Sequence, residues 1–399
     1  MLMETVLDKI LKIMSIVGAR PNFMKIASIA NAIESHNKKQ KVPFIKHFIV
    51  HTGQHYDEKM SHLFFEELGI PRPHVNLEVG SASHAVQTAL IMERFEPILL
   101  EEQPDFLVVV GDVNSTVACC LVASKVIYTK GNMTERPVIV HVEAGLRSFD
   151  RSMPEEINRV LTDSLSDLLF VTEKDALINL HKEGRSKNIF FVGNVMIDTL
   201  ITHKEKAAKL NTIEKILHSK FIRRESKQDI TSYGIVTLHR PCNVDSPSKL
   251  ESLMKAIEKI SQRILLIFPL HPRTKGNFER FGLYQSFQKN NHIVYTESLG
   301  YLDFLSLLSN AAIVLTDSGG IQEETTYLGV PCITLRDNTE RPVTVTKGTN
   351  YLIGTNPDKM IQTAMNILDG NGKKGVVPPL WDGKAGERIV EVLSTYFQN

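Results

Sequence analysis

The chain has 399 residues, of which 42% are hydrophobic and 23% are charged, and its formal net charge is +1 at pH 7. This length and composition predict a soluble globular protein with two domains. The near-zero charge excludes a global electrostatic attraction to nucleic acid or to an anionic membrane, and the sequence lacks an apolar run of the roughly 18 residues that a membrane helix needs.

The first predicted strand, Lys12–Val17, leads into a turn that contains glycine, Gly18–Pro21, and a helix is predicted over Asn22–Ala32. Arg20 and Lys25 lie near the start of this helix, where the helix dipole and the two cations favour an anion. The alternative is a solvated pair of basic side chains at an ordinary helix start.

Strand-like runs alternate with helix-length segments along the rest of the chain. Most runs are continuous in Val, Ile and Leu, which indicates strands of a parallel sheet that are buried on both faces. In the first half, further strands are predicted at Lys46–His51, Phe106–Val110, Pro137–Val142, Leu168–Val171 and Ile189–Val192. In the second half, they are predicted at Tyr233–Leu238, Arg263–Pro269, His292–Tyr295, Ala312–Leu315 and Pro331–Leu335. The alternation predicts an α/β fold of two Rossmann-like, doubly wound domains.

The charged, helix-prone segment Thr202–Asp229 separates the two series of strands. We therefore expect an N-terminal domain over residues 1–200 and a C-terminal domain over residues 201–384. A last helix is predicted at Glu387–Tyr396.

Acidic residues follow two strands and open one helix of the first domain. Asp112 comes just after the third predicted strand and Glu143 just after the fourth, at the sheet edge where doubly wound proteins bind ligands. Asp112 fits equally well as a cap of the helix that begins near Asn114, and Glu155 fits an ordinary helix start after proline. Glu143 is the hardest to explain structurally, because a carboxylate after a buried strand is costly unless it is paired or functional.

His239 ends the first strand of the second domain, at the position that corresponds to the glycine turn of the first domain. A lone histidine at a strand end is more often structural than functional. Its neighbour Arg240 and its place at the predicted ligand edge favour a functional role.

A second glycine turn, Thr316–Gly320, joins the strand Ala312–Leu315 to a helix predicted over Ile321–Leu328. Backbone N–H groups and the helix dipole at such a turn bind anions, and Ser318 can cap the helix or donate its hydroxyl to a phosphate. Glu323 and Glu324 are expected in the first turn of the helix, where a carboxylate can reach a ribose diol. The alternative is an ordinary strand-to-helix turn.

Cysteine and histidine spacing does not predict a metal site. The four cysteines have no C-x-x-C spacing, and the 14 histidines have no H-E-x-x-H spacing. We therefore expect a reduced, cytoplasmic protein without structural zinc.

Ten segments together resemble the non-hydrolysing UDP-N-acetylglucosamine 2-epimerase family. They span nearly the whole chain in the order of the family: GARPNFMK (18–25), TGQH (52–55), GDVNST (111–116), HVEAGLRS (141–148), MPEEINR (153–159), GNVMIDTL (193–200), TLHRPCNVD (237–245), HPRT (271–274), TDSGGIQEE (316–324) and TERP (339–342).

The resemblance implies two domains of the glycosyltransferase-B type that face a cleft, with the C-terminal helix, residues 385–399, packing back on the first domain. It also implies a cytoplasmic homodimer that acts on a UDP-sugar in polysaccharide biosynthesis, with no metal, no other cofactor, and no nucleic-acid or membrane partner. The residues that match the family's catalytic positions are Asp112, Glu143, Glu155 and His239. Those that match its substrate-binding positions are Arg20, Lys25, Phe304, Ser318, Gly319, Gly320, Glu324 and Arg341.

The implied reaction interconverts UDP-N-acetylglucosamine and UDP-N-acetylmannosamine at C2. The C2 proton is not next to a carbonyl group, so simple deprotonation is very difficult. The family instead eliminates UDP to give 2-acetamidoglucal and adds UDP back with the proton on the other face. This chemistry needs carboxylates as acid and base and a site that stabilises the leaving diphosphate. Which carboxylate serves which face stays open.

Several alternatives stay open at this point. The 2-epimerases of UDP-2,3-diacetamido-glucuronate share most of these motifs. A glycosyltransferase of the same fold shares the nucleotide site but needs an acceptor pocket. A protein that only binds the nucleotide sugar has no use for buried carboxylates beside a diphosphate. Hydrolysing epimerases fit less well, because HVEAGLRS and MPEEINR follow the non-hydrolysing pattern.

Overall fold

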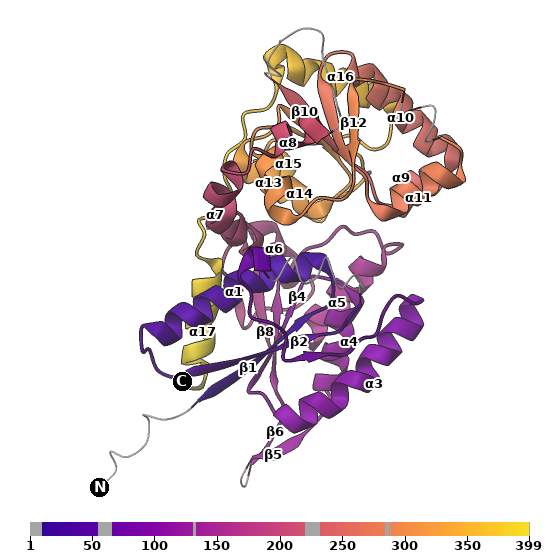
Figure 1. Ribbon diagram of the computed structural model, residues 1–399. Helices are drawn as coiled ribbons and strands as arrows, with labels where there is room; N and C mark the ends of the chain where they lie inside the picture. Colours follow the sequence, from indigo (N-terminus) through magenta and orange to yellow (C-terminus); the bar gives the residue numbers. More distant parts are fainter. Residues whose placement is uncertain are drawn as a thin grey trace. The chain divides into compact units, whose positions relative to one another are not determined.

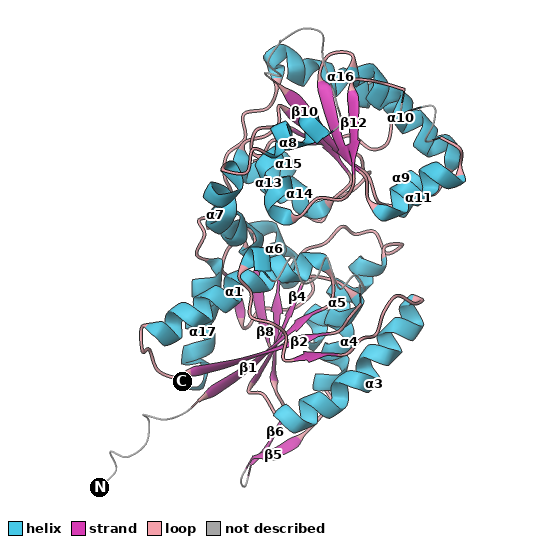
Figure 2. Ribbon diagram, viewed as in Figure 1, coloured by secondary structure: helices cyan, strands magenta, loops and turns pink. Residues whose placement is uncertain are grey.

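The computed structural model describes residues 10–54, 66–130, 133–219, 232–283, 287 and 289–398. The chain divides into two compact units: unit 1 is Met1–Thr199 with Pro379–Asn399, and unit 2 is Leu200–Pro378. In each unit, helices flank a parallel sheet (Figure 1, Figure 2). The predicted fold class, two doubly wound α/β domains, is confirmed.

Unit 1 contains a seven-stranded parallel sheet in the order β3-β2-β1-β4-β7-β8-β9. The strands are β1 (Leu11–Val17), β2 (Ile45–His51), β3 (Val75–Asn76), β4 (Phe106–Val110), β7 (Val138–Val142), β8 (Leu168–Val171) and β9 (Ile189–Phe191). The helices are α1 (Arg20–Lys38), α3 (His84–Glu102), α4 (Asn114–Ala123), α5 (Pro154–Leu165), α6 (Lys174–Lys182), α7 (Val195–Ala208), which contains the boundary between the units, and α17 (Ala385–Thr395), followed by a short 3-10 turn at Tyr396–Gln398. An antiparallel hairpin, β5 (Tyr128–Lys130) with β6 (Met133–Glu135), forms a separate small sheet.

Unit 2 contains a six-stranded parallel sheet in the order β12-β11-β10-β13-β14-β15. The strands are β10 (Tyr233–Thr237), β11 (Leu265–Pro269), β12 (Ile293–Thr296), β13 (Ile313–Thr316), β14 (Cys332–Thr334) and β15 (Asn350–Leu352). The helices are α8 (Thr212–Ser219), α9 (Pro241–Val244), α10 (Pro247–Ser261), α11 (Pro272–Arg280), α13 (Tyr301–Leu308), α14 (Gly319–Leu328), α15 (Pro342–Thr346) and α16 (Pro357–Asn366), with a short π-helical turn at Ile367–Asn371.

Both sheets reverse their strand order at one point. The reversal lies between β1 and β4 in unit 1 and between β10 and β13 in unit 2. Ligands of open parallel sheets bind at the carboxyl ends of the strands beside such a switch point. The segments that leave these four strands begin at Gly18, Gly111, Leu238 and Asp317, so all four lie in or beside motifs that the sequence singles out.

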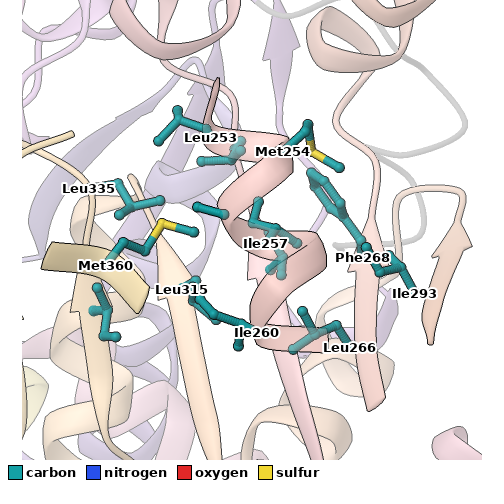
Figure 3. Close-up of a cluster of buried hydrophobic side chains, with 14 of the residues drawn as sticks. Leu253, Met254, Ile257, Ile260, Leu266, Phe268, Ile293, Leu315, Leu335 and Met360 are labelled. Atoms are coloured by element: carbon teal, nitrogen blue, oxygen red, sulfur yellow. The ribbon is translucent and has the colours of Figure 1, made fainter. Parts of the chain in front are cut away.

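The core of unit 2 shows how the apolar pattern fixes one helix on its sheet (Figure 3). Leu253, Met254 and Ile257 of α10 recur at helical spacing, and all three are almost fully buried. They belong to one cluster with Leu315 of β13 and Leu335, which follows β14. Burying a side chain of this size contributes about 1.5–3 kcal/mol. The stripe therefore holds α10 against the strands that carry the candidate site.

Helix α1 is longer than predicted, since it begins at Arg20 and ends at Lys38 rather than spanning Asn22–Ala32. Its last turns are polar and partly exposed, and a Glu34–Lys38 ion pair of 2.6 Å links them at helical spacing. A prediction that ends where the apolar pattern ends misses such a solvated extension.

The last helix, α17, packs against α1 within unit 1. The Asp198 carboxylate joins the two helices, because its Oδ2 accepts from the Ser28 hydroxyl at 2.6 Å and from the Gly386 amide at 2.8 Å. Before α17, the indole of Trp381 donates to the carbonyl of Thr172 at 3.2 Å. Across the described residues, no helix combines the length and apolar character needed to cross a membrane.

Candidate active site

Glu143 of unit 1 forms a buried ion pair with Lys25. It follows β7, and its Oε2 lies 2.5 Å from Lys25 Nζ, with side-chain exposures of 2% and 7%. Each charge would be costly in this position without the other. The backbone of Glu143 has φ 73°, in the left-handed region, which costs a non-glycine residue about 1–3 kcal/mol. The surrounding structure therefore holds this carboxylate in a fixed and strained place.

The Gly111–Asp112 turn lies beside this ion pair. Gly111 has φ 70°, and a Cβ atom there would lie 2.6 Å from Lys25 Nζ and 3.6 Å from Glu143 Oε2. Glycine adopts this conformation without strain, and any side chain here would displace Lys25 Nζ. Asp112 does not cap α4, whose N-cap is Val113, so the capping alternative is wrong. Its Oδ2 instead pairs with Arg159 Nη1.

Helix α5 supplies the partner of Asp112. Arg159 is buried and contacts both Asp112 and Glu156, with 2.7 Å between its Nη2 and Glu156 Oε2. Glu156 also accepts from the amide and hydroxyl of Ser148, each at 2.9 Å. Burial raises the pKa of Glu156, but the Ser148 amide and the Arg159 guanidinium outweigh burial and lower it. Glu155 is half-buried at the second position of the same helix.

In unit 2, His239 pairs with Asp317 across the switch point. The strands that precede them are neighbours, and His239 Nδ1 lies 2.9 Å from Asp317 Oδ1. Asp317 is fully buried and also accepts from the amides of His239 and Arg240 and from the Asn243 side chain, at 2.9 to 3.1 Å. Burial alone would raise the pKa of Asp317. The contacts with His239 and with the two backbone amides outweigh burial, so the pKa is lowered from its usual value. Because Nδ1 faces a carboxylate, Nε2 is the ring nitrogen of His239 left to meet a ligand.

The turn after β13 presents the amino end of α14. Ser318 occupies the N-cap position, but its side chain makes no capping hydrogen bond, so of its two expected roles only the ligand contact stays a prediction. Ser318, Gly319 and Gly320 are all half-buried, at the positive end of a ten-residue helix. Such an end binds anions. A Cβ atom on Gly319 would lie 2.6 Å from Glu340 Oε1, so a larger residue would force this carboxylate to move.

Glu323 and Glu324 are not in the first turn of this helix, contrary to the prediction. The helix begins at Gly319, which places both carboxylates in its second turn. Glu323 Oε1 lies 2.7 Å from Arg341 Nε in an ion pair, and both residues are buried. Glu324 lies beside Tyr301, whose phenol has a pKa raised by burial and then by this carboxylate.

The remaining predicted site residues are spread over both units. Phe304 is half-buried in α13 and packs against an apolar cluster that includes Leu307 and Val314. Arg341 is buried and contacts Glu340 at 2.9 Å as well as Glu323. Arg20 is the first residue of α1, and its side chain lies outside the described part of the structure, as does His55 of the TGQH segment.

Sequence reasoning did not predict the partners Arg159 and Asp317. The spacing of Glu156 and Arg159, three residues apart on a helix, is a local signal for one of these contacts. Nothing local signals the contacts that join segments about 50 to 80 residues apart, namely Arg159 with Asp112 and Asp317 with His239.

Together these groups can serve acid–base chemistry and anion binding. Unit 1 presents the carboxylates Asp112, Glu143 and Glu155 in three different settings, and carboxylates in different settings can divide the roles of acid and base. Unit 2 presents His239 and the helix start at Ser318, which suit a phosphate. Within the described ranges, no cluster of three or more His, Cys, Asp or Glu side chains could hold a metal ion.

Comparisons with known proteins agree over nearly the full chain. The family profile described as UDP-N-acetylglucosamine 2-epimerase matches residues 37–394. A protein of Methanocaldococcus jannaschii named UDP-N-acetylglucosamine 2-epimerase is 43% identical over 387 residues, which cover 96% of this chain and 99% of that protein. A Pseudomonas aeruginosa protein named UDP-2,3-diacetamido-2,3-dideoxy-D-glucuronate 2-epimerase is 38% identical, with coverage of 96% and 99%. The crystal structure of the M. jannaschii UDP-GlcNAc 2-epimerase in complex with UDP-GlcNAc and UDP gives a TM-score of 0.84, with coverage of 97% of this chain and 100% of that one.

Proposed function

Because the chain belongs to the UDP-N-acetylglucosamine 2-epimerase family, we propose that it interconverts UDP-N-acetylglucosamine and UDP-N-acetylmannosamine without hydrolysing them. The observation that carries the proposal is the buried Lys25–Glu143 pair beside the Gly111–Asp112 turn, at the switch point of unit 1. A buried carboxylate held in a strained backbone is typical of a catalytic position. The protein is thus an isomerase, since an epimerase belongs to this class of enzymes. The M. jannaschii relative is also named UDP-N-acetylglucosamine 2-epimerase.

In the proposed reaction, a carboxylate of unit 1 takes the C2 proton while the bond between C1 and the diphosphate oxygen breaks. The electron pair of the C2–H bond forms the C1=C2 bond of 2-acetamidoglucal, and UDP leaves. Re-addition of UDP with a proton delivered to the other face of C2 gives the epimer. Asp112, Glu143 and Glu155 are the proposed acids and bases, and Lys25 and Arg159 hold two of them in place.

The departing UDP is proposed to be held by unit 2. His239 and the amino end of α14 would neutralise the diphosphate, and Glu324 would bind the ribose diol. Phe304 and Arg341 complete the proposed substrate-binding set in unit 2, and Arg20 and Lys25 are the substrate-binding residues proposed in unit 1.

Glu324→Ala should weaken UDP binding by about 1–3 kcal/mol, because a buried, charged hydrogen bond to the ribose is lost. Isothermal titration calorimetry with UDP measures the change. Glu279→Ala, which removes an exposed acid of the same unit, is the matched control and should leave the affinity unchanged. Equal affinities for the Glu324 variant and the parent chain would exclude the ribose contact.

Incubation with UDP-N-acetylglucosamine alone in deuterated water tests the function. We expect a second UDP-sugar and deuterium at C2 of both sugars. A glycosyltransferase or a protein that only binds the sugar would produce neither without an acceptor. A hydrolysing enzyme would release UDP and free N-acetylmannosamine.

A second candidate substrate follows from the P. aeruginosa relative, which is named for a diacetamido-glucuronate sugar and is 38% identical. A panel of UDP-2-acetamido sugars compared by kcat/KM separates the two substrates. A higher kcat/KM for the diacetamido-uronate would support the proposed epimerase reaction but contradict UDP-N-acetylglucosamine as the preferred substrate.

The family resemblance also supports a homodimer, a cytoplasmic location and a role in polysaccharide biosynthesis. Sedimentation equilibrium of the full chain tests the first of these. A species with the mass of one chain at micromolar concentration would contradict the homodimer.

A further inference from the structure

His141 lies in the middle of the unit 1 sheet and is fully buried. It belongs to β7, and its strand neighbours are Val109 of β4 and Leu169 of β8. Most of the surrounding strand residues are apolar. The proposed chemistry does not use His141, although it lies two residues before Glu143.

Both ring nitrogens of His141 face oxygen atoms. Nδ1 lies 2.6 Å from Asp163 Oδ1, and Nε2 lies 2.9 Å from the carbonyl oxygen of Gly111. A carbonyl oxygen can only accept a hydrogen bond, so Nε2 must carry a proton. The nitrogen that faces Asp163 must also carry one if that carboxylate is ionised.

Asp163 has the contacts of an ionised carboxylate. Its Oδ2 accepts from the Gly145 amide at 3.0 Å and lies 2.7 Å from Arg147 Nη1. Burial raises the pKa of Asp163, and the contacts with His141, Arg147 and the Gly145 amide lower it below its usual value. The Gly145 amide and the Arg147 guanidinium can only donate to this carboxylate, which favours its ionised form, so the His141 ring has to donate from both nitrogens.

The hydrogen bond from Nε2 fixes the turn that carries Asp112. The Gly111 amide donates to Val142 at 3.0 Å, and the Gly111 carbonyl accepts from His141. The next carbonyl, that of Asp112, accepts from Asn158 at 2.9 Å. Hydrogen bonds from His141 and Asn158 thus hold two successive carbonyl groups of the turn. The Lys25–Glu143 pair lies beside Gly111 in the same turn.

We propose that His141 is a positioning residue: as a buried imidazolium ion, it clamps the Gly111 carbonyl to the Asp163 carboxylate and thereby holds Asp112 at the distance from Glu143 that the reaction needs. His141 does not touch the substrate in this role. The kinetic part of this inference rests on the proposed epimerase function, whereas the protonation of the ring does not.

Nitrogen-15 NMR of the full chain with labelled histidine tests the protonation. At pH 7, we expect both ring nitrogens of His141 to carry protons, assigned by their loss in a His141 variant. His47 is an internal comparison, because burial and then His74 lower its pKa to about 4, and its Nε2 lies 2.8 Å from the Ser15 hydroxyl, which can accept or donate. His47 should show one protonated nitrogen. A single protonated nitrogen on His141 would overturn the proposal.

Two substitutions separate positioning from a purely structural role. In His141→Gln, the amide nitrogen can take the place of Nε2 and keep the bond to Gly111. In His141→Asn, it can take the place of Nδ1 and keep only the bond to Asp163. Both remove the charge and the ring, so both should destabilise unit 1 to a similar extent.

We expect His141→Asn to lower kcat about 10–100-fold, with KM and UDP affinity within about threefold of the parent values, and His141→Gln to keep most of the turnover. Rates are compared per folded protein, from circular dichroism and thermal unfolding. Equal kcat values for the two variants would overturn the positioning role. Absence of activity in the parent chain would instead refute the proposed function. The NMR measurement would then test on its own whether His141 is a doubly protonated ring that bridges Gly111 and Asp163.

Discussion

Replacing Glu143 by glutamine should lower kcat at least about a hundredfold while UDP still binds. The amide keeps the shape of the side chain but cannot exchange a proton with C2, and Lys25 loses its counter-charge. UDP affinity is expected to persist because most of the proposed nucleotide contacts come from unit 2. Steady-state epimerisation rates and calorimetry with UDP measure the two effects.

Glu391→Gln is the matched control for this substitution, since it removes an exposed carboxylate from α17 of the same unit. It should leave turnover as it is. Near-normal turnover of the Glu143 variant would remove this residue from the mechanism. Asp112→Asn and Glu155→Gln should act in the same direction and by a similar factor.

Asp317→Asn should destabilise unit 2 by about 2–4 kcal/mol. The buried carboxylate accepts from four donors, and an asparagine turns an N–H group toward some of them. The folded state lowers the pKa of Asp317, so its contribution is complete above the ordinary aspartate pKa and is lost as the pH falls through the lowered value. The difference between parent and variant should therefore shrink in acid.

Differential scanning calorimetry measures this loss. The only tryptophan, Trp381, lies in unit 1, so its fluorescence follows that unit separately. Asp369→Asn is the control, because it breaks an exposed ion pair with Arg263 that contributes little. An unchanged calorimetric transition in the Asp317 variant would show that the network adds nothing to the stability of unit 2.

The strands could be predicted from the sequence because most are continuous apolar runs, and the observed ends lie within two residues of the predicted ones. The strand order could not be predicted, since β1 pairs with β4 across about 90 residues and no local pattern specifies that partner. The sequence does not predict the short strands β3, β5, β6 and β15, because a segment of two or three residues offers no continuous apolar run.

The candidate site was predictable to the level of motifs. Asp112, Glu143 and His239 follow strands at the expected edge, which the sequence pattern alone suggests. Their partners depend on which elements meet in space, as the contact of Arg159 with Asp112 shows. The first-turn position predicted for Glu324 is wrong for a local reason: the glycine pattern indicates a turn at Gly319 and Gly320, although both adopt helical conformation and begin α14.

Three side chains of helix α5 each hold a different segment of unit 1 in place. This restricts how the length of the helix can vary among related sequences. Glu156 holds the Ser148 loop, Arg159 holds Asp112, and Asp163 holds His141. Inserting or deleting one residue between Glu156 and Asp163 would rotate one contact against another by about 100° and shift it by about 1.5 Å. Gaps in pairwise alignments of relatives should therefore fall outside this helix, and a single-residue deletion within it should abolish activity even where the chain still folds.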